Sequence, residues 1–251
     1  MPHRSDVAFV LTRYPFRERD LIVVLLTRHE GQIRVLARRA RGGRHPGSGA
    51  LEPLAFVRVD YFERPKSELA SLDSAEALRS PFDLAALPAA WAAGQVVAEL
   101  AMLYCPPGQR AEPAFRLVDR CLAALRAGQD ALTVAGYAEF WFLRLAGVMP
   151  DPGRCGVCDA VIDEARRVFD AREGTFVCAQ HAAGGTRLSA GTIGWLVAAA
   201  VSPIEAVDRP LPADGLELLS QLRRRFTDRD LKSWPYLASL CRATPGTNGR
   251  R

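Results

Sequence analysis

Residues 154–181 read RCGVCDAVIDEARRVFDAREGTFVCAQH and contain two ligand pairs of equal spacing, Cys155 with Cys158 and Cys178 with His181. A Cys-x-x-Cys turn lets two thiolates reach one tetrahedral ion, and a second pair completes the four-ligand shell that zinc prefers. The strand-like segments RRVFD and GTFVC, joined by AREG, predict a hairpin between the pairs. We therefore predict a metal site formed by Cys155, Cys158, Cys178 and His181, within a zinc-binding insert at 153–183.

The predicted metal site has the features of a structural centre. A catalytic zinc keeps an open coordination position and needs an acid or base nearby, whereas here four ligands come from one compact unit. No histidine of the chain is followed by Glu two residues later, as zinc deaminases require, and HEGQI at 29–33 lacks the second His of a metalloprotease helix. Motifs of nucleotide-binding loops and of nucleophile elbows are also missing. We expect a structural zinc ion (Zn2+) and no catalytic residues.

The first 80 residues have the pattern of β-structure. Five short strand-like segments, separated by Gly- and Pro-containing turns, predict a small closed barrel, the OB-fold class, over residues 1–80. In GQIRVLA, residues 31–37, strict alternation places Ile33, Val35 and Ala37 inside the barrel and Arg34 outside. The fold class is therefore α+β multidomain, provided that the rest of the chain is helical.

From residue 81 the composition becomes rich in Ala and Leu. Apolar residues at spacings of three and four predict an α-helical domain over 81–241, interrupted by the zinc-binding insert. The helices are expected at 84–104, 112–127, 131–147, 189–201 and 214–226. The final residues, 242–251, predict a disordered tail.

The charge of the chain favours an anionic partner. The formal net charge is +5, and residues 28–66 contain nine basic residues against four acidic ones. Cations beside aromatic rings on a small barrel are typical of single-stranded nucleic-acid sites. The candidate DNA-binding residues are Arg34, Arg38, Arg39, Arg41, Arg44 and Arg58, with a secondary cluster of Arg223, Arg224, Arg225 and Lys232. We expect Phe56 and Phe62 to be packed against the helical domain rather than exposed.

Several strings, in this order along the chain, resemble the RecO family of bacterial recombination mediators. They are YPFRERDLIVVLLTRHEGQIRVLARRARG at 14–42, FWFLRLAGVMPDPGRCGVCD at 140–159 and RDLKSWPYL at 229–237. The resemblance implies an OB-fold, a helical domain with a zinc-binding insert, and activity without catalysis. His181 departs from the family's usual fourth cysteine.

The resemblance also implies partners and an activity. Members of the family bind single- and double-stranded DNA, anneal complementary strands and help load the recombinase onto strands coated by single-strand-binding protein. Their partners are the RecR clamp protein and the acidic C-terminal tail of the single-strand-binding protein. For the tail, a groove among the helices of 84–147, near Arg116, Arg120 or Arg126, is the expected place.

Two other functions fit parts of the pattern. An OB barrel with a basic face is also found in RNA-binding accessory factors. Zinc beside a basic domain would also suit a nucleic-acid-processing enzyme, if a coordination position were open. The start of the chain lacks a secretory apolar run, and the most apolar stretch, 84–103, contains Pro88, Gln95 and Glu99. We expect a cytoplasmic, nucleoid-associated protein that does not bind a membrane.

Overall fold

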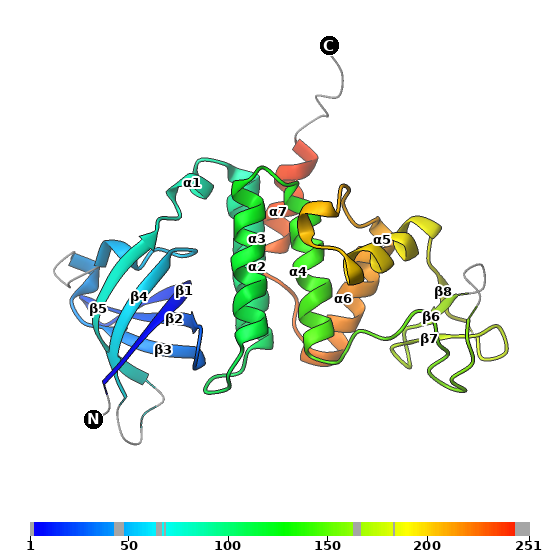
Figure 1. Ribbon diagram of the computed structural model, residues 1–251, viewed down its shortest axis with the longest axis horizontal. Helices are drawn as coiled ribbons and strands as arrows, with labels where there is room; N and C mark the ends of the chain where they lie inside the picture. The colour runs from blue at the N-terminus through cyan, green and yellow to red at the C-terminus, as the bar shows by residue number, and fades with distance from the viewer. Residues whose placement is uncertain are drawn as a thin grey trace, which may run out of the picture.

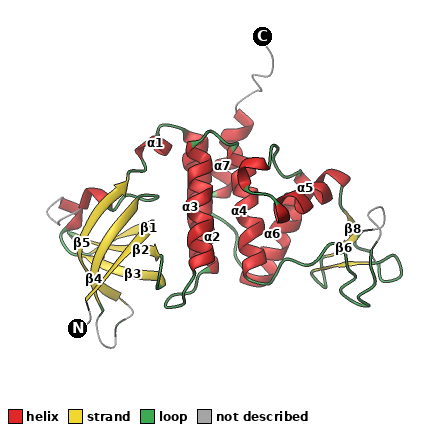
Figure 2. Cartoon of the chain, viewed as in Figure 1, coloured by secondary structure: helices red, strands yellow, loops and turns green. Residues whose placement is uncertain are grey.

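The chain forms three units arranged along one axis. The structure is a computed structural model that describes residues 3–42, 48–63, 67, 69–162, 167–182 and 184–243. Figure 1 shows a β-barrel at one end, a group of helices in the middle and a small β-sheet at the other end. Figure 2 shows that the strands lie in the barrel and the small sheet, whereas the long helices lie between them. Within the described residues, no helix is long and apolar enough to span a bilayer.

The barrel is a closed sheet of five strands. They are β1 (His3–Phe16), β2 (Asp20–Thr27), β3 (Gly31–Ala37), β4 (Phe56–Phe62) and β5 (Leu69–Arg79). The strand order is β1-β2-β3-β5-β4, closed by the β1–β4 pair, and only β3 and β5 run parallel. This is an OB-type barrel, and it confirms the predicted fold class.

The alternation within β3 holds. Val35 and Ala37 belong to the barrel core and Ile33 packs against it, while Arg34 is exposed. Gln32 also points out of the barrel core, yet it is buried, because the helical domain covers that end of the strand.

A tight contact joins the barrel to the helices. Gly31 has a φ of 73°, and a Cβ on it would lie 1.8 Å from the carbonyl oxygen of Gln109. The amide of Gly108 donates to the carbonyl of Gln32 at 3.2 Å, so the loop before α3 extends the edge of β3. Only glycine fits at position 31.

Aromatic rings of β1 and β4 continue the junction. Phe9 lies 5.1 Å and Phe56 6.2 Å from Phe115, ring centroid to ring centroid. The prediction that Phe56 packs on the helices is confirmed. The same prediction is wrong for Phe62, which lies at the far end of β4 against His3, at 4.8 Å. β4 runs away from the helices, so its two outer rings have different neighbours.

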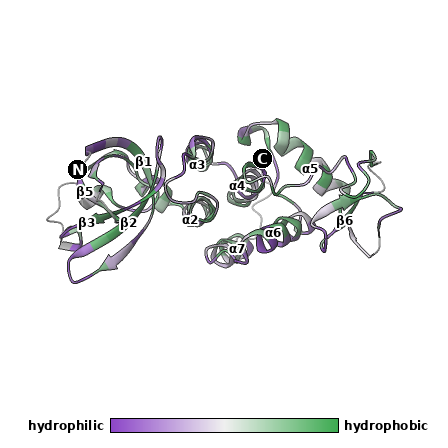
Figure 3. Ribbon diagram, turned by 90° about the horizontal axis from the view of Figure 1, so that it is seen from below, coloured by the Kyte–Doolittle hydropathy of each residue, from purple (hydrophilic) through white to green (hydrophobic). Residues whose placement is uncertain are grey.

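The helical domain follows the barrel directly. Its helices are α1 (Phe82–Ala85), α2 (Pro88–Tyr104), α3 (Glu112–Arg126), α4 (Ala131–Leu145), α5 (Ala190–Val201), α6 (Ala213–Thr227) and α7 (Trp234–Ala243). In Figure 3, α2, α3 and α4 are seen nearly end-on, side by side between the barrel and the small sheet. Sequence periodicity located five of these helices to within a few residues but missed α1 and α7. Residues 242 and 243 of the predicted tail belong to α7, and 244–251 lie outside the described residues.

The third unit is the insert between α4 and α5. Its short strands β6 (Val168–Asp170), β7 (Thr175–Val177) and β8 (Thr186–Arg187) form a sheet in the order β7-β6-β8. Phe169 and Phe176 from this sheet are buried in the same hydrophobic core as the helices. The insert is thus packed on the helical domain and does not form a core of its own.

Candidate metal centre and nucleic-acid interface

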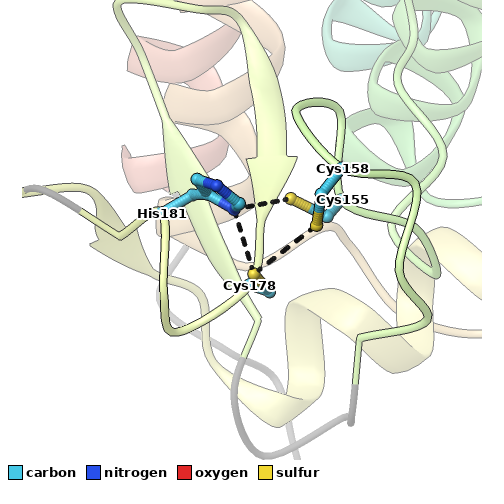
Figure 4. Close-up of side chains that lie close together, drawn as sticks. All are labelled: Cys155, Cys158, Cys178 and His181. Carbon is cyan, nitrogen blue, oxygen red and sulfur yellow. Dashed lines mark hydrogen bonds between the residues drawn. The ribbon is translucent and has the colours of Figure 1, made fainter.

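The four predicted metal ligands meet at one point of the insert. Their ligand atoms all lie within 4.8 Å of one another (Figure 4). His181 Nδ1 is 3.3 Å from Cys178 Sγ and 3.7 Å from Cys155 Sγ, and the sulfur atoms of Cys158 and Cys178 are 4.0 Å apart. Zn–S bonds of about 2.3 Å in a tetrahedral shell place neighbouring sulfur atoms about 3.8 Å apart. The side chains therefore fit a tetrahedral zinc ion.

A backbone hydrogen bond closes each of the two ligand turns, and in the second turn the amide of His181 donates to the carbonyl of Cys178 at 3.0 Å. In the first, the amide of Asp159 donates to the carbonyl of Cys155 at 2.8 Å, and Asp159 itself has a φ of 57°. The amide of Gly156 donates to the carbonyl of Phe176 in β7 at 2.8 Å. A Cβ on Gly156 would lie 2.4 Å from the side chain of Thr175, so glycine lets the turn approach this strand.

The electrostatics of the cluster favour the thiolates of Cys155 and Cys178. For Cys158, a backbone hydrogen bond from Ala160 lowers the pKa, but the hydrogen bond with Cys155 and burial outweigh it and raise the pKa. Burial raises the pKa of Cys155, but hydrogen bonds from the backbone of Cys178, Cys158 and Val157 outweigh it and lower the pKa to about 6. A hydrogen bond from His181 lowers the pKa of Cys178. In contrast, burial raises the pKa of Cys105 and of Cys121 to about 12, as expected for packing residues. Two thiols of the cluster, Cys155 and Cys178, thus have the lowered pKa that suits a metal ligand.

A metal in this cluster would hold the insert together. The four protein ligands fill the shell of a tetrahedral ion, and the centre joins the turn after α4 to the end of β7. Figure 1 places the insert and the barrel at opposite ends of the molecule, so the centre is remote from the arginine-rich barrel.

Three of the predicted DNA-binding arginines gather at one end of the barrel. Arg38, Arg39 and Arg41 are exposed where the chain leaves β3. The Arg39 amide donates to the carboxylate of Asp20 at 2.9 Å, and Arg39 has a φ of 58°. These contacts fix the backbone of the segment and leave its guanidinium groups at the surface.

The structure adds two arginines that the sequence reasoning missed. Arg17 and Arg19, in the turn between β1 and β2, are exposed beside Arg41. The amide of Arg41 donates to the carbonyl of Arg19 at 3.0 Å, and its side chain reaches the carbonyl of Arg17 at 3.5 Å. We call Arg17, Arg19, Arg38, Arg39 and Arg41 the barrel-end patch. The pairing of β2 with both β1 and β3 brings these two sequence segments together.

The remaining barrel candidates are placed differently. Arg34 is exposed further along β3, away from the strand end. Arg58 on β4 is 2.7 Å from Glu76, so its charge is neutralised locally. Arg44 lies outside the described residues.

The predicted secondary cluster is divided by the fold. Arg223 is buried and ion-paired with Glu139 at 2.8 Å, so it cannot contact a phosphate, and the prediction of a surface cluster is corrected at this position. Arg225 donates to the carbonyls of Ala171, at 3.3 Å, and Arg172, which ties α6 to the turn between β6 and β7.

The other two members of that cluster stay at the surface. Arg224 is exposed but lies 3.0 Å from Asp230. Lys232 is exposed and forms no ion pair within the part of the chain that the structure describes. Of the four residues, Arg225 and Lys232 are therefore exposed without an ion pair among the described residues, and Arg225 is held by two backbone carbonyls.

Comparison with known proteins gives a consistent assignment. The family model of the recombination protein O N-terminal domain matches residues 1–81, and that of its C-terminal domain matches residues 88–236. A DNA repair protein RecO from Koribacter versatilis (strain Ellin345) is 40% identical over 177 residues, 70% of this chain and 71% of the relative. One from Anaeromyxobacter sp. (strain K) is 35% identical over 242 residues, 92% of this chain and 94% of the relative. With an OB-type barrel, a helical domain and a Cys3His cluster in the expected order, the chain belongs to the RecO family of DNA repair proteins.

Proposed function

We propose that this protein is a non-catalytic recombination mediator that binds single- and double-stranded DNA and anneals complementary strands. The observation that carries the proposal is the barrel-end patch on a RecO-family OB barrel. Five exposed arginines from two adjacent segments face solvent there, with Glu18 and Asp20 as the acidic residues of the β1–β2 turn. Arginine side chains of this kind neutralise phosphates without reading sequence.

Annealing would follow from charge neutralisation. Two complementary strands repel each other through their phosphates, and the repulsion falls when cations lie between them. A patch that extends over two strand turns can contact phosphates of both DNA strands. The protein then acts by bringing strands together, and it needs no bond-breaking step.

The zinc centre has a structural role in this proposal. Its four protein ligands fill a tetrahedral shell, so a bound water has no position from which to attack. The centre would keep the insert folded on the helices.

A pocket in the helical domain suits the acidic tail of the single-strand-binding protein. The cavity of about 200 Å³ lies beside the loop before α3 and is lined by Tyr104, Phe142, Leu145 and Arg110, among others. An exposed arginine beside apolar walls offers a place for the carboxylates of such a peptide. Of the residues expected from the sequence, Arg126 is ion-paired with Asp83 at 2.7 Å and is less suited to this role.

The remaining partners rest on family membership. We propose that a RecR-type clamp protein binds this chain and that the complex helps load the recombinase onto coated single strands. Localisation to the nucleoid would follow from DNA binding.

An annealing assay tests the proposal. Complementary strands coated with single-strand-binding protein are mixed with the zinc-containing protein in the absence of nucleotide. We expect faster duplex formation with chemically intact strands. Failure to anneal, or strands that are cut or deaminated, would contradict a non-catalytic mediator.

A further inference from the structure

The helix α5 has an apolar outer face at the surface of the molecule. It contains no charged residue, whereas each of the other α-helices in the described part of the chain contains at least one. In Figure 3, α5 is coloured as hydrophobic over most of its length and lies at the edge of the molecule. A surface helix of a soluble protein normally turns charged or polar side chains to water. The composition of α5 therefore suggests that its outer face is covered by a partner.

Burial distinguishes the two sides of α5. The inner side packs in the core of the helical domain through Ile193, Trp195 and Leu196. On the outer side, Val197 is 48% and Val201 is 80% exposed, and residues four apart lie on the same face of a helix. We use the name α5 face for the exposed residues at this spacing, which are Ala190, Gly194, Val197 and Val201.

The shape of the α5 face suits a second α5. A Cβ on Gly194 would meet no atom within 4 Å, so another backbone can approach closely at this position. Consider two antiparallel α5 helices whose common centre lies between Val197 and Ala198. Val201 of one copy then lies opposite Gly194 of the second copy, and the same contact occurs again on the other side of the centre. The largest exposed side chain of the face thereby meets its most open position.

The charges at the two ends of α5 favour the same antiparallel arrangement. Arg187 is exposed just before the N-cap residue Ser189, and Glu205 is exposed just after the end of the helix. Neither forms an ion pair with any residue in the described ranges. A twofold axis through α5 would bring Arg187 of each copy near Glu205 of the other, and it would align the two helix dipoles in opposite directions. A parallel pair would instead place like charges together.

We propose that the α5 face is a self-association surface, on which a second copy of this chain binds antiparallel about a twofold axis. Self-association of this kind requires no DNA, so the proposal does not depend on the proposed function. Figure 1 shows α5 on the side of the helical domain away from the barrel, so the barrel-end patches of both copies stay free. If the proposed function holds, two joined copies would hold two strands close together, which would assist annealing.

The small size of the α5 face predicts a weak and reversible pair. A helix of 12 residues is about 18 Å long, and one face of it covers roughly 200 Å². Stable complexes bury about 800 Å² on each partner, so we expect self-association only near 100 μM, as an order of magnitude. Copies bound close together on DNA reach effective concentrations of about 1 mM, which is enough to join them.

Sedimentation equilibrium of the intact zinc-containing protein, without DNA, tests the proposal. We expect the average mass to rise from one copy to two between roughly 10 and 1000 μM. Val201→Glu should weaken this association about tenfold or more, because it places a charge in the apolar contact. Phe82→Glu, which changes another exposed apolar residue on α1, is the matched control. A single-copy mass at every concentration, or equal weakening by the control, would overturn the proposal and leave the proposed function standing.

Charge reversal tests the antiparallel arrangement. Arg187→Glu and Glu205→Arg each place like charges at both ends of the pair, so each variant alone should associate about tenfold or more weakly. In an equal mixture of the two variants, every contact between the ends of two different chains joins opposite charges again. We therefore expect the mixture to pair as readily as the unmodified protein. A mixture that associates no better than the single variants would overturn the antiparallel pair.

An annealing assay tests the role of the pair in bringing strands together. Val201→Glu should slow the annealing of complementary strands while its affinity for one strand stays unchanged, because the barrel-end patch is remote from α5 (Figure 1). An annealing rate equal to that of the unmodified protein would overturn this role.

Discussion

Arg223 of α6 and Glu139 of α4 form an ion pair inside the helical domain, with Arg223 Nε 2.8 Å from Glu139 Oε1 and both side chains almost fully buried. The same guanidinium donates from Nη1 to the carbonyl of Arg229 at 2.7 Å. The pair therefore does more than join two helices, because it also fixes the 228–233 segment, which lines the cavity of about 1840 Å³ between the barrel and the helices.

Removal of the Glu139 charge should destabilise the protein strongly. Glu139→Gln leaves the buried Arg223 guanidinium with only the exposed carboxylate of Asp230, 3.5 Å away, as a counter-charge, and we expect a loss of about 3 kcal/mol in the free energy of unfolding. Urea unfolding at pH 7 measures it. Arg224→Ala is the matched control, since its pair with Asp230 is exposed and should contribute less than about 1 kcal/mol. If Glu139→Gln lost no more stability than about 1 kcal/mol, as expected for the control, the buried pair would not be important for the stability of the fold.

The contact between barrel and helices predicts a difference between two glycines. Gly31 and Gly108 both have positive φ, 73° and 75°, but only Gly31 has a backbone neighbour where a Cβ would lie. Gly108→Ala should cost about 1 kcal/mol, the conformational term alone, whereas Gly31→Ala should cost clearly more because the 106–111 loop must move. Thermal unfolding of both variants checks this. Equal effects would show that the junction yields easily.

The sequence predicted most of the fold because the patterns that determine it are local. Alternation in β3 located the barrel interior, and the spacing of Cys155, Cys158, Cys178 and His181 located the metal cluster. Each pattern depends on a few neighbouring residues, so a single sequence contains it.

What the sequence missed depends on contacts between distant segments. Arg17 and Arg19 join the patch only because β2 pairs with both neighbours. The charge of Arg223 looked like part of a surface cluster, and its partner, Glu139, is 84 residues away. The helix α7 was overlooked because it is short and begins with Trp234-Pro235. The cavity between the barrel and the helices is lined by three separate parts of the chain.

Zinc removal should affect one end of the molecule only. Chelation is expected to abolish hydrogen-exchange protection of the insert around Cys155 and Cys178 and to leave the barrel protected, because the two lie at opposite ends (Figure 1). DNA affinity of the barrel-end patch should change by less than about twofold.

Ligand variants refine the test of the zinc centre. His181→Cys keeps a complete set of four ligands and should retain about one zinc ion per chain, whereas Cys158→Ala should lose it. Metal analysis of the purified proteins gives the answer. A metal-free His181→Cys protein would mean that the imidazole is specifically required.

The start of α5 should depend on pH through Asp214. Burial raises the pKa of Asp214, but hydrogen bonds from the Ser189 amide and from the Thr192 and Ser189 hydroxyls outweigh it and hold the pKa below its usual value. A lowered folded-state pKa stabilises the fold above the unfolded pKa of 3.8, and this contribution is lost as the pH falls through the folded value.

The variant Asp214→Asn isolates this contribution. At pH 7 it should be less stable by about 1–2 kcal/mol, and the difference from the unmodified protein should shrink as the pH falls below 4. Urea unfolding at a series of pH values measures the difference. A gap that stays constant down to pH 2 would contradict a role for the charge.

The salt dependence of DNA affinity tests the role of the barrel-end patch most directly. The affinity for a single strand is measured at several salt concentrations for the unmodified protein, for a variant with Arg38, Arg39 and Arg41 changed to Ala, and for Arg58→Ala as the control, since Arg58 is paired with Glu76. We expect the triple variant to bind all sequences more weakly and its log–log salt slope to fall by roughly 2, at about 0.7 for each lost phosphate contact. The control should keep its slope. An unchanged slope and affinity in the triple variant would remove this surface from DNA binding.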